Sequence, residues 1–356
     1  MKGMKNIIVA LLSLVTVTSF AGNKDRSGEA GASELLINPW ARSSGLAGSN
    51  SAYVIGLEAI NTNVAGLAFT PKTELLFAHT RYLSGTGIGI NSFGFSQKLG
   101  ESNVIGVSVM SMNFGEIERT TTNLPEGGIG TFKISYSNIG ISYAKEFSNS
   151  IYGGATVKVV SEGISNARSS GVALDAGIRY VTGEYDQIKF GIALRNVGPP
   201  MKFSGDGLTV KNETANGQIL SQSQKSAQFE MPSLLNIGGS YDFYFNSTVD
   251  SATYEIKSDH KLTVGMNFTS NSFTKDQIRV GAEYAFMSKF MIRGGYMYEQ
   301  GIFNAEERTQ AHTGPTAGFS IELPLNKAGS SFSLDYGYQF SNPWSGSHTI
   351  GARINL

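Results

Sequence analysis

The residue types that most often carry catalysis or bind metals form no recognisable constellation in this sequence. The four histidines, His79, His260, His312 and His348, are scattered and lack the spacing that places two imidazoles on one face of a helix. The Gly-x-Ser-x-Gly turn typical of serine hydrolases is absent, and so is cysteine. We therefore expect no enzyme, no metal site and no cofactor.

The charged residues do follow a pattern, because they alternate with apolar residues on either side of short turns. Around Ser288, for example, Glu283 and Arg293 are equidistant from the turn, and Ile292 and Tyr284 lie on the opposite phase. Side chains that alternate in this way point to opposite faces of a strand. The spacing predicts a direct cross-strand ion pair, of the kind that stabilises a ladder by about 0.2–1 kcal/mol.

The same arithmetic about Trp344 places Asp335 opposite Arg353. Charges of this kind are expensive on a lipid-facing surface, so we expect them to point into the interior of a barrel. Two interpretations stay open, a structural network of salt bridges and a lining that sets pore selectivity. The predicted lumen charge lattice consists of Asp175, Arg179, Arg195, Glu283, Arg293, Asp335 and Arg353.

Segments of strand length with this alternation fill the chain from Thr73 to its end. Most have 10–14 residues, which is about the length of a tilted strand that crosses a membrane, with some overhang. We predict an all-β fold, a 14-stranded antiparallel transmembrane β-barrel over residues 73–356. The predicted strands are 74–83, 86–98, 103–114, 137–147, 150–162, 171–181, 187–197, 233–246, 259–270, 276–287, 289–300, 313–323, 330–341 and 347–356.

The beginning of the chain indicates export. Lys2 and Lys5 precede an apolar run and the small-x-small pattern that ends at Ala21, which predicts a signal peptide over residues 1–21. Without these residues 26 basic and 28 acidic residues remain, and this balance argues against nucleic-acid binding. Charged residues make up only 16% of the chain, which also favours a membrane protein. We expect an integral outer-membrane protein in contact with lipid.

Residues 22–72 do not alternate and are too few for a separate domain of ordinary size. Wide barrels often carry a segment inserted into their interior. We therefore predict that this stretch is an N-terminal plug inside the barrel.

Two motifs in this stretch resemble the opening signature of the PorV/PorQ family, a branch of the FadL-like outer-membrane barrels. They lie in Leu36 to Gly48 and in Asn63 to Ala68, where Val64 replaces the usual proline. A further similarity lies in Met110 to Thr121, and the chain departs from many outer-membrane barrels in ending on Leu356. The plug-motif residues are Asn38, Pro39, Arg42, Gly45, Asn63 and Gly66.

The resemblance implies a fourteen-stranded barrel with an internal plug, in the type IX secretion system of Bacteroidota. It also implies partners: translocon or attachment-complex proteins, or the C-terminal signal domains of secreted cargo. The alternative is that the protein takes up hydrophobic small molecules, the other role of FadL-like barrels. That role requires an apolar pocket against the plug.

Two long connections are candidates for partner contact. Residues 198–232 and 115–136 each combine apolar residues with adaptable polar stretches, as protein-binding loops do. A flexible cap over the barrel mouth explains them equally well. The candidate partner-binding residues are Pro199, Pro200, Met201, Phe203, Ile129 and Phe132.

Overall fold

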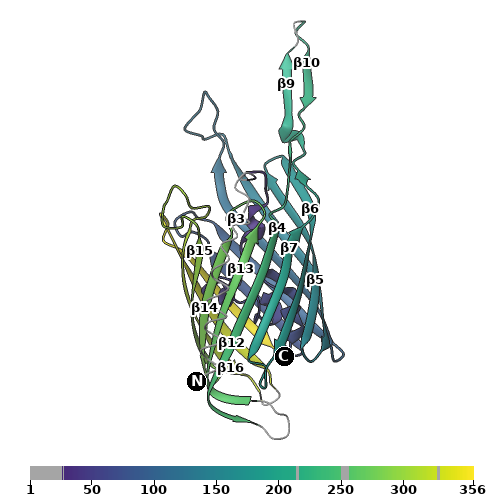
Figure 1. The fold of residues 1–356 in the computed structure, drawn as a ribbon. Helices are drawn as coiled ribbons and strands as arrows, with labels where there is room; N and C mark the ends of the chain where they lie inside the picture. Colours follow the sequence, from purple (N-terminus) through teal and green to yellow (C-terminus); the bar gives the residue numbers. More distant parts are fainter. Residues whose placement is uncertain (1–25, 27, 214–215, 250–255, 327–328) are drawn as a thin grey trace.

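The computed structural model describes residues 26, 28–213, 216–249, 256–326 and 329–356. The predicted signal peptide lies outside them. Within the described residues, fourteen antiparallel strands close into a barrel, as the alternation predicts (Figure 1). The strands of the barrel are β1 (Thr73–Arg81), β2 (Gly89–Leu99), β3 (Asn103–Glu118), β4 (Thr131–Ser148), β5 (Ile151–Ile164), β6 (Ala167–Thr182), β7 (Ile188–Val197), β12 (Leu234–Val249), β13 (Ile256–Asn271), β14 (Gln277–Phe286), β15 (Phe290–Glu299), β16 (His312–Pro324), β17 (Ser331–Ser341) and β18 (Ser347–Asn355).

The barrel closes between its first and last strands. Thr80 pairs with Thr349 and Glu74 pairs with Asn355 in the β1–β18 ladder, and Leu356 accepts a backbone hydrogen bond from Thr73. Closure matters because backbone groups at an open edge would have no partner in the hydrocarbon of a bilayer. Each described barrel strand pairs with the next one along the chain, except that β7 pairs with β12 across an insertion.

The outer wall of the barrel is an apolar belt. Outward side chains alternate with inward ones on every strand, and Ile141 at the middle of β4 is 64% exposed in the isolated chain. Such a surface is stable only against lipid. Other members of the belt are Phe77, Phe93, Val107, Val157, Leu174, Ile178, Ile192, Val264, Ile292, Phe319, Leu334 and Ile350. In the described part of the chain, no helix has the length and apolar character needed to span a membrane.

The two ends of the barrel differ. We call the outer end the one with the longest connections, 119–130, 198–233 and 300–311, and the inner end the opposite one. Strands β3 and β4 extend farther toward the outer end than the alternation of apolar and polar residues predicts. Above the apolar belt both faces of a strand can carry polar or charged residues, so the strands continue where the alternation ends. As a result, the predicted loop 115–136 is shortened to 119–130.

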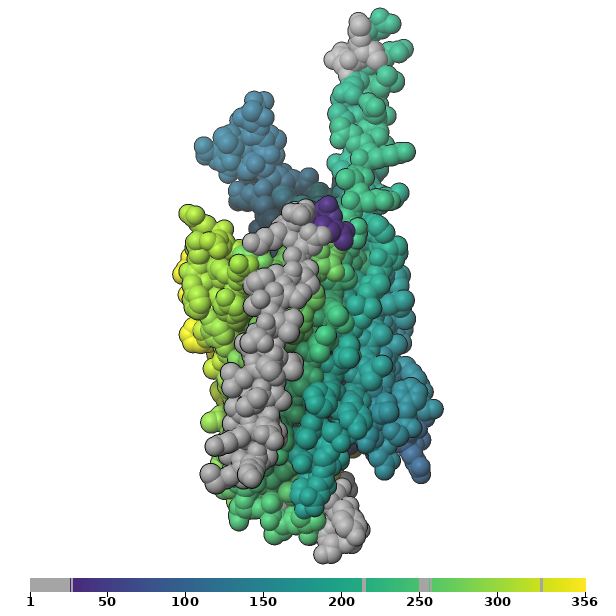
Figure 2. Space-filling model, viewed as in Figure 1, coloured from purple at the N-terminus to yellow at the C-terminus, as the bar shows by residue number. Residues whose placement is uncertain are grey.

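The insertion between β7 and β12 forms an arm at the outer end. A short ladder of β8 (Met201–Lys202) with β11 (Gln228–Phe229) forms its base, followed by the turn η5 (Asp206–Leu208). Above this base, β9 (Thr209–Glu213) pairs with β10 (Ile219–Ser223). Figures 1 and 2 show that the β9–β10 hairpin stands clear of the barrel.

Residues 28–72, here called the N-terminal segment, line the inside of the barrel. The segment starts at the outer end, where Ala30 forms a bridge with Glu230, and leads to β1 at the inner end. It is folded into short helical turns, whose contacts are with strands from several sides of the wall. These turns are η2 (Ser33–Leu36), α2 (Ala41–Gly45), η3 (Gly56–Asn61) and η4 (Val64–Phe69).

The main apolar core lies between the N-terminal segment and the inner half of the wall. Trp40, Leu57 and Leu67 of the segment pack in one cluster with Leu76 of β1 and Val104 of β3. Each of these side chains is at most 2% exposed. The segment therefore supplies the core that the barrel interior would otherwise lack.

The apolar belt leads to a first prediction. Ile141→Arg places a cation at the middle of the lipid-facing surface of β4 and should destabilise the barrel in a bilayer by about 2–4 kcal/mol. Ser135→Arg, on the same face of β4 but above the belt, should cost no more than about 1 kcal/mol. Denaturant unfolding of the protein in lipid vesicles measures both values. Equal effects of the two substitutions would contradict the placement of the belt.

Candidate functional site

The lumen contains a network of ion pairs that joins the N-terminal segment to the last strands. Arg42 of α2 binds Asp335 of β17 at 2.8 Å and Glu322 of β16 at 3.3 Å. Burial by itself lowers the pKa of the Arg42 guanidinium, but the charges of Asp335, Glu58 and Glu322 outweigh it and raise that pKa above its usual value. Arg42 therefore stays charged inside the barrel.

Arg353 of β18 connects three elements. It forms ion pairs with Glu58 of η3 and with Glu74 of β1, the latter at 3.3 Å. Glu58 in turn accepts hydrogen bonds from the backbone and the hydroxyl of Ser43, at 3.1 and 2.9 Å. One guanidinium thus contacts the first strand, the last strand and the N-terminal segment.

The predicted pairing of Asp335 with Arg353 has the wrong register. Asp335 is opposite Gly351, and Arg353 is opposite Ser333, because the ladder is centred on Pro343 and not on Trp344. The two charged side chains are still diagonal neighbours on the inner face, with Arg353 Nε 4.0 Å from Asp335 Oδ2. A shift of two residues preserves the face of a strand, which is why the inward placement is correct.

The second predicted pair is confirmed. Glu283 is opposite Arg293 in the β14–β15 ladder, and their side chains are 2.8 Å apart. Arg293 also donates to Ser320 Oγ at 2.8 Å. A Cβ atom on Gly45 of the N-terminal segment would lie 3.1 Å from Arg293 Cδ, so this glycine is the residue that permits close contact between the segment and the wall.

The three remaining lattice residues also point inward, but they do not form one site. Asp175 binds Lys158 and lies 3.8 Å from Arg195, whereas Arg179 donates to the carbonyl of Val54 at 2.9 Å. The guanidinium of Arg179 also stacks 4.1 Å from the ring centroid of Phe69. Lys158 was not predicted, although its inward phase on β5 is visible in the sequence. Glu58 lies in a segment without alternation and gave no signal.

The plug-motif asparagines hold the N-terminal segment in place. Asn63 Nδ2 donates to the carbonyls of Ser51 and of Ile178 on β6, and its Oδ1 accepts from the Ala65 amide. Asn38 Oδ1 accepts from the Trp40 amide, and its Nδ2 donates to Thr62.

Two other motif residues lie where the N-terminal segment is closely packed. Pro39 is buried, and a Cβ atom on Gly66 would collide with the carbonyl of Val54. The motif therefore describes how the segment packs, and no reactive group is among its members.

The outer half of the lumen contains an apolar cluster rich in methionine, here called the outer cluster. Inward side chains of β2 to β6 meet residues from the N-terminal segment and from the base of the arm. Methionine adapts its shape readily and is common on surfaces that accept varied apolar ligands. The outer cluster consists of Ala32, Leu35, Ile90, Met110, Met112, Tyr136, Val160, Ala173, Met201 and Met231.

The candidate partner-binding residues are divided between the surface and the interior. Pro199, Pro200 and Ile129 are exposed, whereas Phe203 and Phe132 are half-buried. Met201 is only 2% exposed and belongs to the outer cluster, so the prediction that it contacts a partner does not fit this structure. Its placement was not visible in the sequence, because β8 is too short to show alternation.

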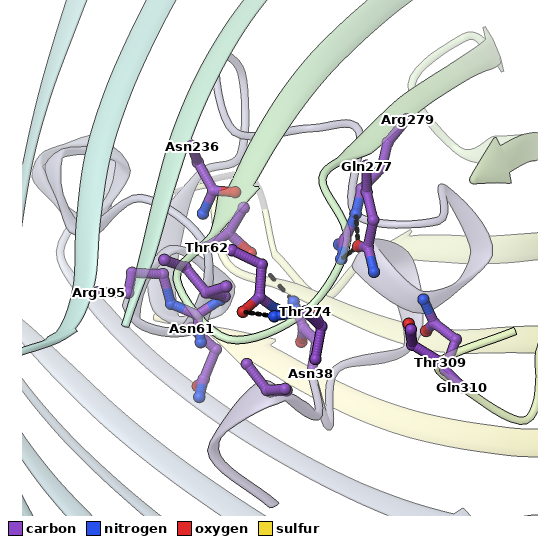
Figure 3. Close-up of a pocket in the computed structure, with 14 residues that line it drawn as sticks. Asn38, Asn61, Thr62, Arg195, Asn236, Thr274, Gln277, Arg279, Thr309 and Gln310 are labelled. Atoms are coloured by element: carbon purple, nitrogen blue, oxygen red, sulfur yellow. Dashed lines mark hydrogen bonds between the residues drawn. The ribbon is translucent and has the colours of Figure 1, made fainter. Parts of the chain in front are cut away.

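A polar cavity of about 110 Å³ lies between the N-terminal segment and the wall, in the outer half of the lumen. Figure 3 shows Arg195 and Arg279 on two sides of it, with Asn61 and Asn236 on the side of Arg195. A further cavity of about 320 Å³ lies in the inner half and is lined by charged residues, among them Arg42 of the network and Lys189, which pairs with Asp242.

No protein-family model matches the sequence, and no curated protein matches it. Among solved structures, the chain is similar to the Pseudomonas putida toluene transporter TodX, with a TM-score of 0.54 and 12% identity over 89% of this chain and 97% of that one. The CymD monoaromatic hydrocarbon channel matches with a TM-score of 0.52 and 14% identity over 90% of this chain and 97% of that one. The Ralstonia pickettii toluene transporter TbuX matches with a TM-score of 0.51 and 15% identity over 89% of this chain and 97% of that one.

At such low identity these similarities show the fold alone, that of a closed β-barrel. The predicted barrel of fourteen antiparallel strands is confirmed, and the outer-membrane location stays a prediction. The three proteins are described as two toluene transporters and a monoaromatic hydrocarbon channel. They carry no information about the PorV/PorQ branch.

The ion pairs of Arg42 yield a second prediction. Arg42→Gln removes the close cationic partner of the buried Asp335 carboxylate and leaves it only the longer contact with Arg353, at 4.0 Å. Loss of a buried ion-pair partner typically destabilises a protein by about 3–5 kcal/mol. Denaturant unfolding in micelles should show this decrease, and limited proteolysis should cut the N-terminal segment faster. Lys133→Gln, which removes an exposed ion pair with Glu116 at the outer end, is the control and should change neither quantity. An unaltered cleavage rate in Arg42→Gln would contradict the role of Arg42 in holding the segment.

Proposed function

We propose that this protein is an outer-membrane channel through which small hydrophobic molecules enter the cell. The observation that carries the proposal is the outer cluster, because the interior of a transmembrane barrel is usually polar. Here the inward positions of β3 are occupied by Met110 and Met112, and Tyr136 of β4 is beside them. This surface offers an apolar ligand a site directly below the outer end.

The N-terminal segment is the element that such a ligand would have to displace. Leu35 and Ala32 of the segment are part of the outer cluster, and Ile37 packs against it. In this proposal the predicted plug acts as a gate. Its apolar residues face the outer cluster, and its charged anchors lie deeper in the lumen. The fold is shared with proteins described as toluene transporters and as a monoaromatic hydrocarbon channel, which supports this class of ligand.

The test is a binding measurement with a small aromatic hydrocarbon. Purified protein is saturated with a fluorescent apolar probe, which is then displaced by toluene. The double variant Met110→Gln, Met112→Gln should bind toluene at least about tenfold more weakly, since burial of each apolar side chain contributes about 1.5–3 kcal/mol. Met287→Gln, at an exposed inner turn, is the matched control. Equal affinity in the double variant and the wild type would refute the outer cluster as the site.

A second candidate function is favoured by the arm. The β9–β10 hairpin exposes Ile219 and Leu220 to 70% and 55%, at a distance from the barrel where lipid does not cover them. Two-stranded hairpins without support are marginally stable in water, so a protein partner would stabilise this one. We propose as this candidate that the arm binds type IX translocon or attachment-complex proteins, or the C-terminal domains of secreted cargo.

Deletion of residues 209–223 tests this second candidate, because it removes the hairpin and leaves the β8–β11 base intact. The tagged variant should lose the proteins that accompany the wild type from native membranes in mild detergent. Deletion of residues 121–127 from the other long outer loop is the control. Retention of every partner by the arm deletion would exclude the arm. Unchanged toluene binding in the same variant would show that the two candidates are separate.

A further inference from the structure

The polar cavity in the outer half of the lumen has an unusual balance of charge. Arg195 of β7 and Arg279 of β14 line it, and no carboxylate of the described residues does so. Arg279 donates through Nε and Nη2 to a neutral acceptor, Gln277 Oε1. The two guanidinium charges repel one another across the cavity, and their burial is unfavourable. The carboxylate of Glu299, which lies behind the lining residues Gln277, Thr309 and Gln310, offsets this only in part.

Arg195 is only partly compensated by its neighbours. Its Nη2 donates to the carbonyl of Leu35 at 3.4 Å, and its Nε, 3.8 Å from Asp175, has no hydrogen-bond partner. Asp175 is already bound by Lys158 and by the Asn196 amide. Since Arg195 is 7% exposed, its unused donor is in the interior of the protein and not in bulk solvent.

The amides around the cavity offer it mainly donors. Asn61 Oδ1 accepts from Trp40 Nε1 at 2.9 Å, and Asn236 Oδ1 accepts from Thr269 Oγ1 at 2.8 Å. An indole N–H can only donate, so the orientation of the Asn61 amide is fixed by chemistry. With their oxygens used, both amides have NH₂ groups left for the cavity that they line (Figure 3). Two guanidiniums and two such NH₂ groups form a set of donors around one space.

We propose that this cavity binds a compact oxyanion, with phosphate or a short carboxylate as the chemical class. A volume of about 110 Å³ is several times what one water molecule requires. Guanidinium groups match the oxygens of phosphate and carboxylate in a planar, bidentate geometry. The anion would contact both the N-terminal segment, through Asn61, and the barrel wall, through the two arginines. The cavity shares no lining residue with the outer cluster proposed as the site for hydrophobic molecules.

Titration of the full-length protein in a nonionic detergent with inorganic phosphate, followed by calorimetry, tests the proposal. Ionic strength is held constant with sodium chloride, and acetate is the second probe. We expect saturable binding and a midpoint of thermal unfolding that rises with phosphate concentration. Arg279→Gln should weaken binding about tenfold or more, since it removes a charge-assisted hydrogen-bond donor. Arg119→Gln, at an exposed loop arginine, should leave the affinity unchanged.

Asn236→Asp should abolish phosphate binding and, unlike Arg279→Gln, should do so by supplying a negative charge to the cavity. Residue 236 is the diagonal neighbour of Arg195 on the adjoining strand, so a carboxylate there would take the place of the anion. The variant should no longer bind phosphate, and without phosphate its thermal midpoint should exceed that of the wild type. Three results would overturn the proposal: no saturable binding of either probe, an equal response to chloride, or an unchanged affinity in both cavity variants.

Discussion

The ion pairs of Arg353 are the interaction on which the rest of the structure depends. This side chain is on the last strand and binds Glu74 of the first strand and Glu58 of the N-terminal segment. Barrel closure and the seating of the segment thus share one guanidinium. In a lipid-embedded barrel the lumen is the only place where such charges are tolerated, and a buried charge without its partner is costly. The second charged anchor is close to this seam, because Arg42 of the segment binds Asp335 and Glu322 on β17 and β16.

The lumen is divided along its length by the chemistry of its side chains. Near the seam and the inner end, charged residues hold the segment, whereas the outer half of β2 to β6 presents methionines and aromatic residues. Movement of the outer part of the segment would break mainly apolar contacts, which methionine can rearrange at small expense. Movement of the inner part would separate buried ions. For the gate proposed above, this difference favours opening at the outer part of the segment while the inner part stays anchored.

The sequence was sufficient for the architecture because the period of two is a local signal. It identified all fourteen barrel strands and the inward phase of residues such as Glu283 and Arg293, whose pairing also followed from a tight turn. For Asp335 the turn was less regular, and an error of one residue in its centre moved the partner by two. Glu58 and Met201 were beyond reach for a different reason. Their positions are set by the packing of non-repetitive segments inside the barrel, which no local pattern encodes.

The similarity to hydrocarbon transporters says less about function than the residues that line the lumen do. At 12–15% identity the shared feature is a closed wall of fourteen strands, and such a wall can enclose many functions. What distinguishes one function from another is the lining and the elements added at the outer end. Here a methionine-rich apolar cluster packs against the N-terminal segment, which is anchored by charged side chains, and an arm extends away from the barrel. We proposed the outer cluster as a site for apolar molecules and the arm as a site for a protein partner. The β9–β10 hairpin stands clear of the barrel, but Met201 at the base of the arm belongs to the outer cluster. A partner on the arm would therefore be bound to an element that is continuous with the apolar site.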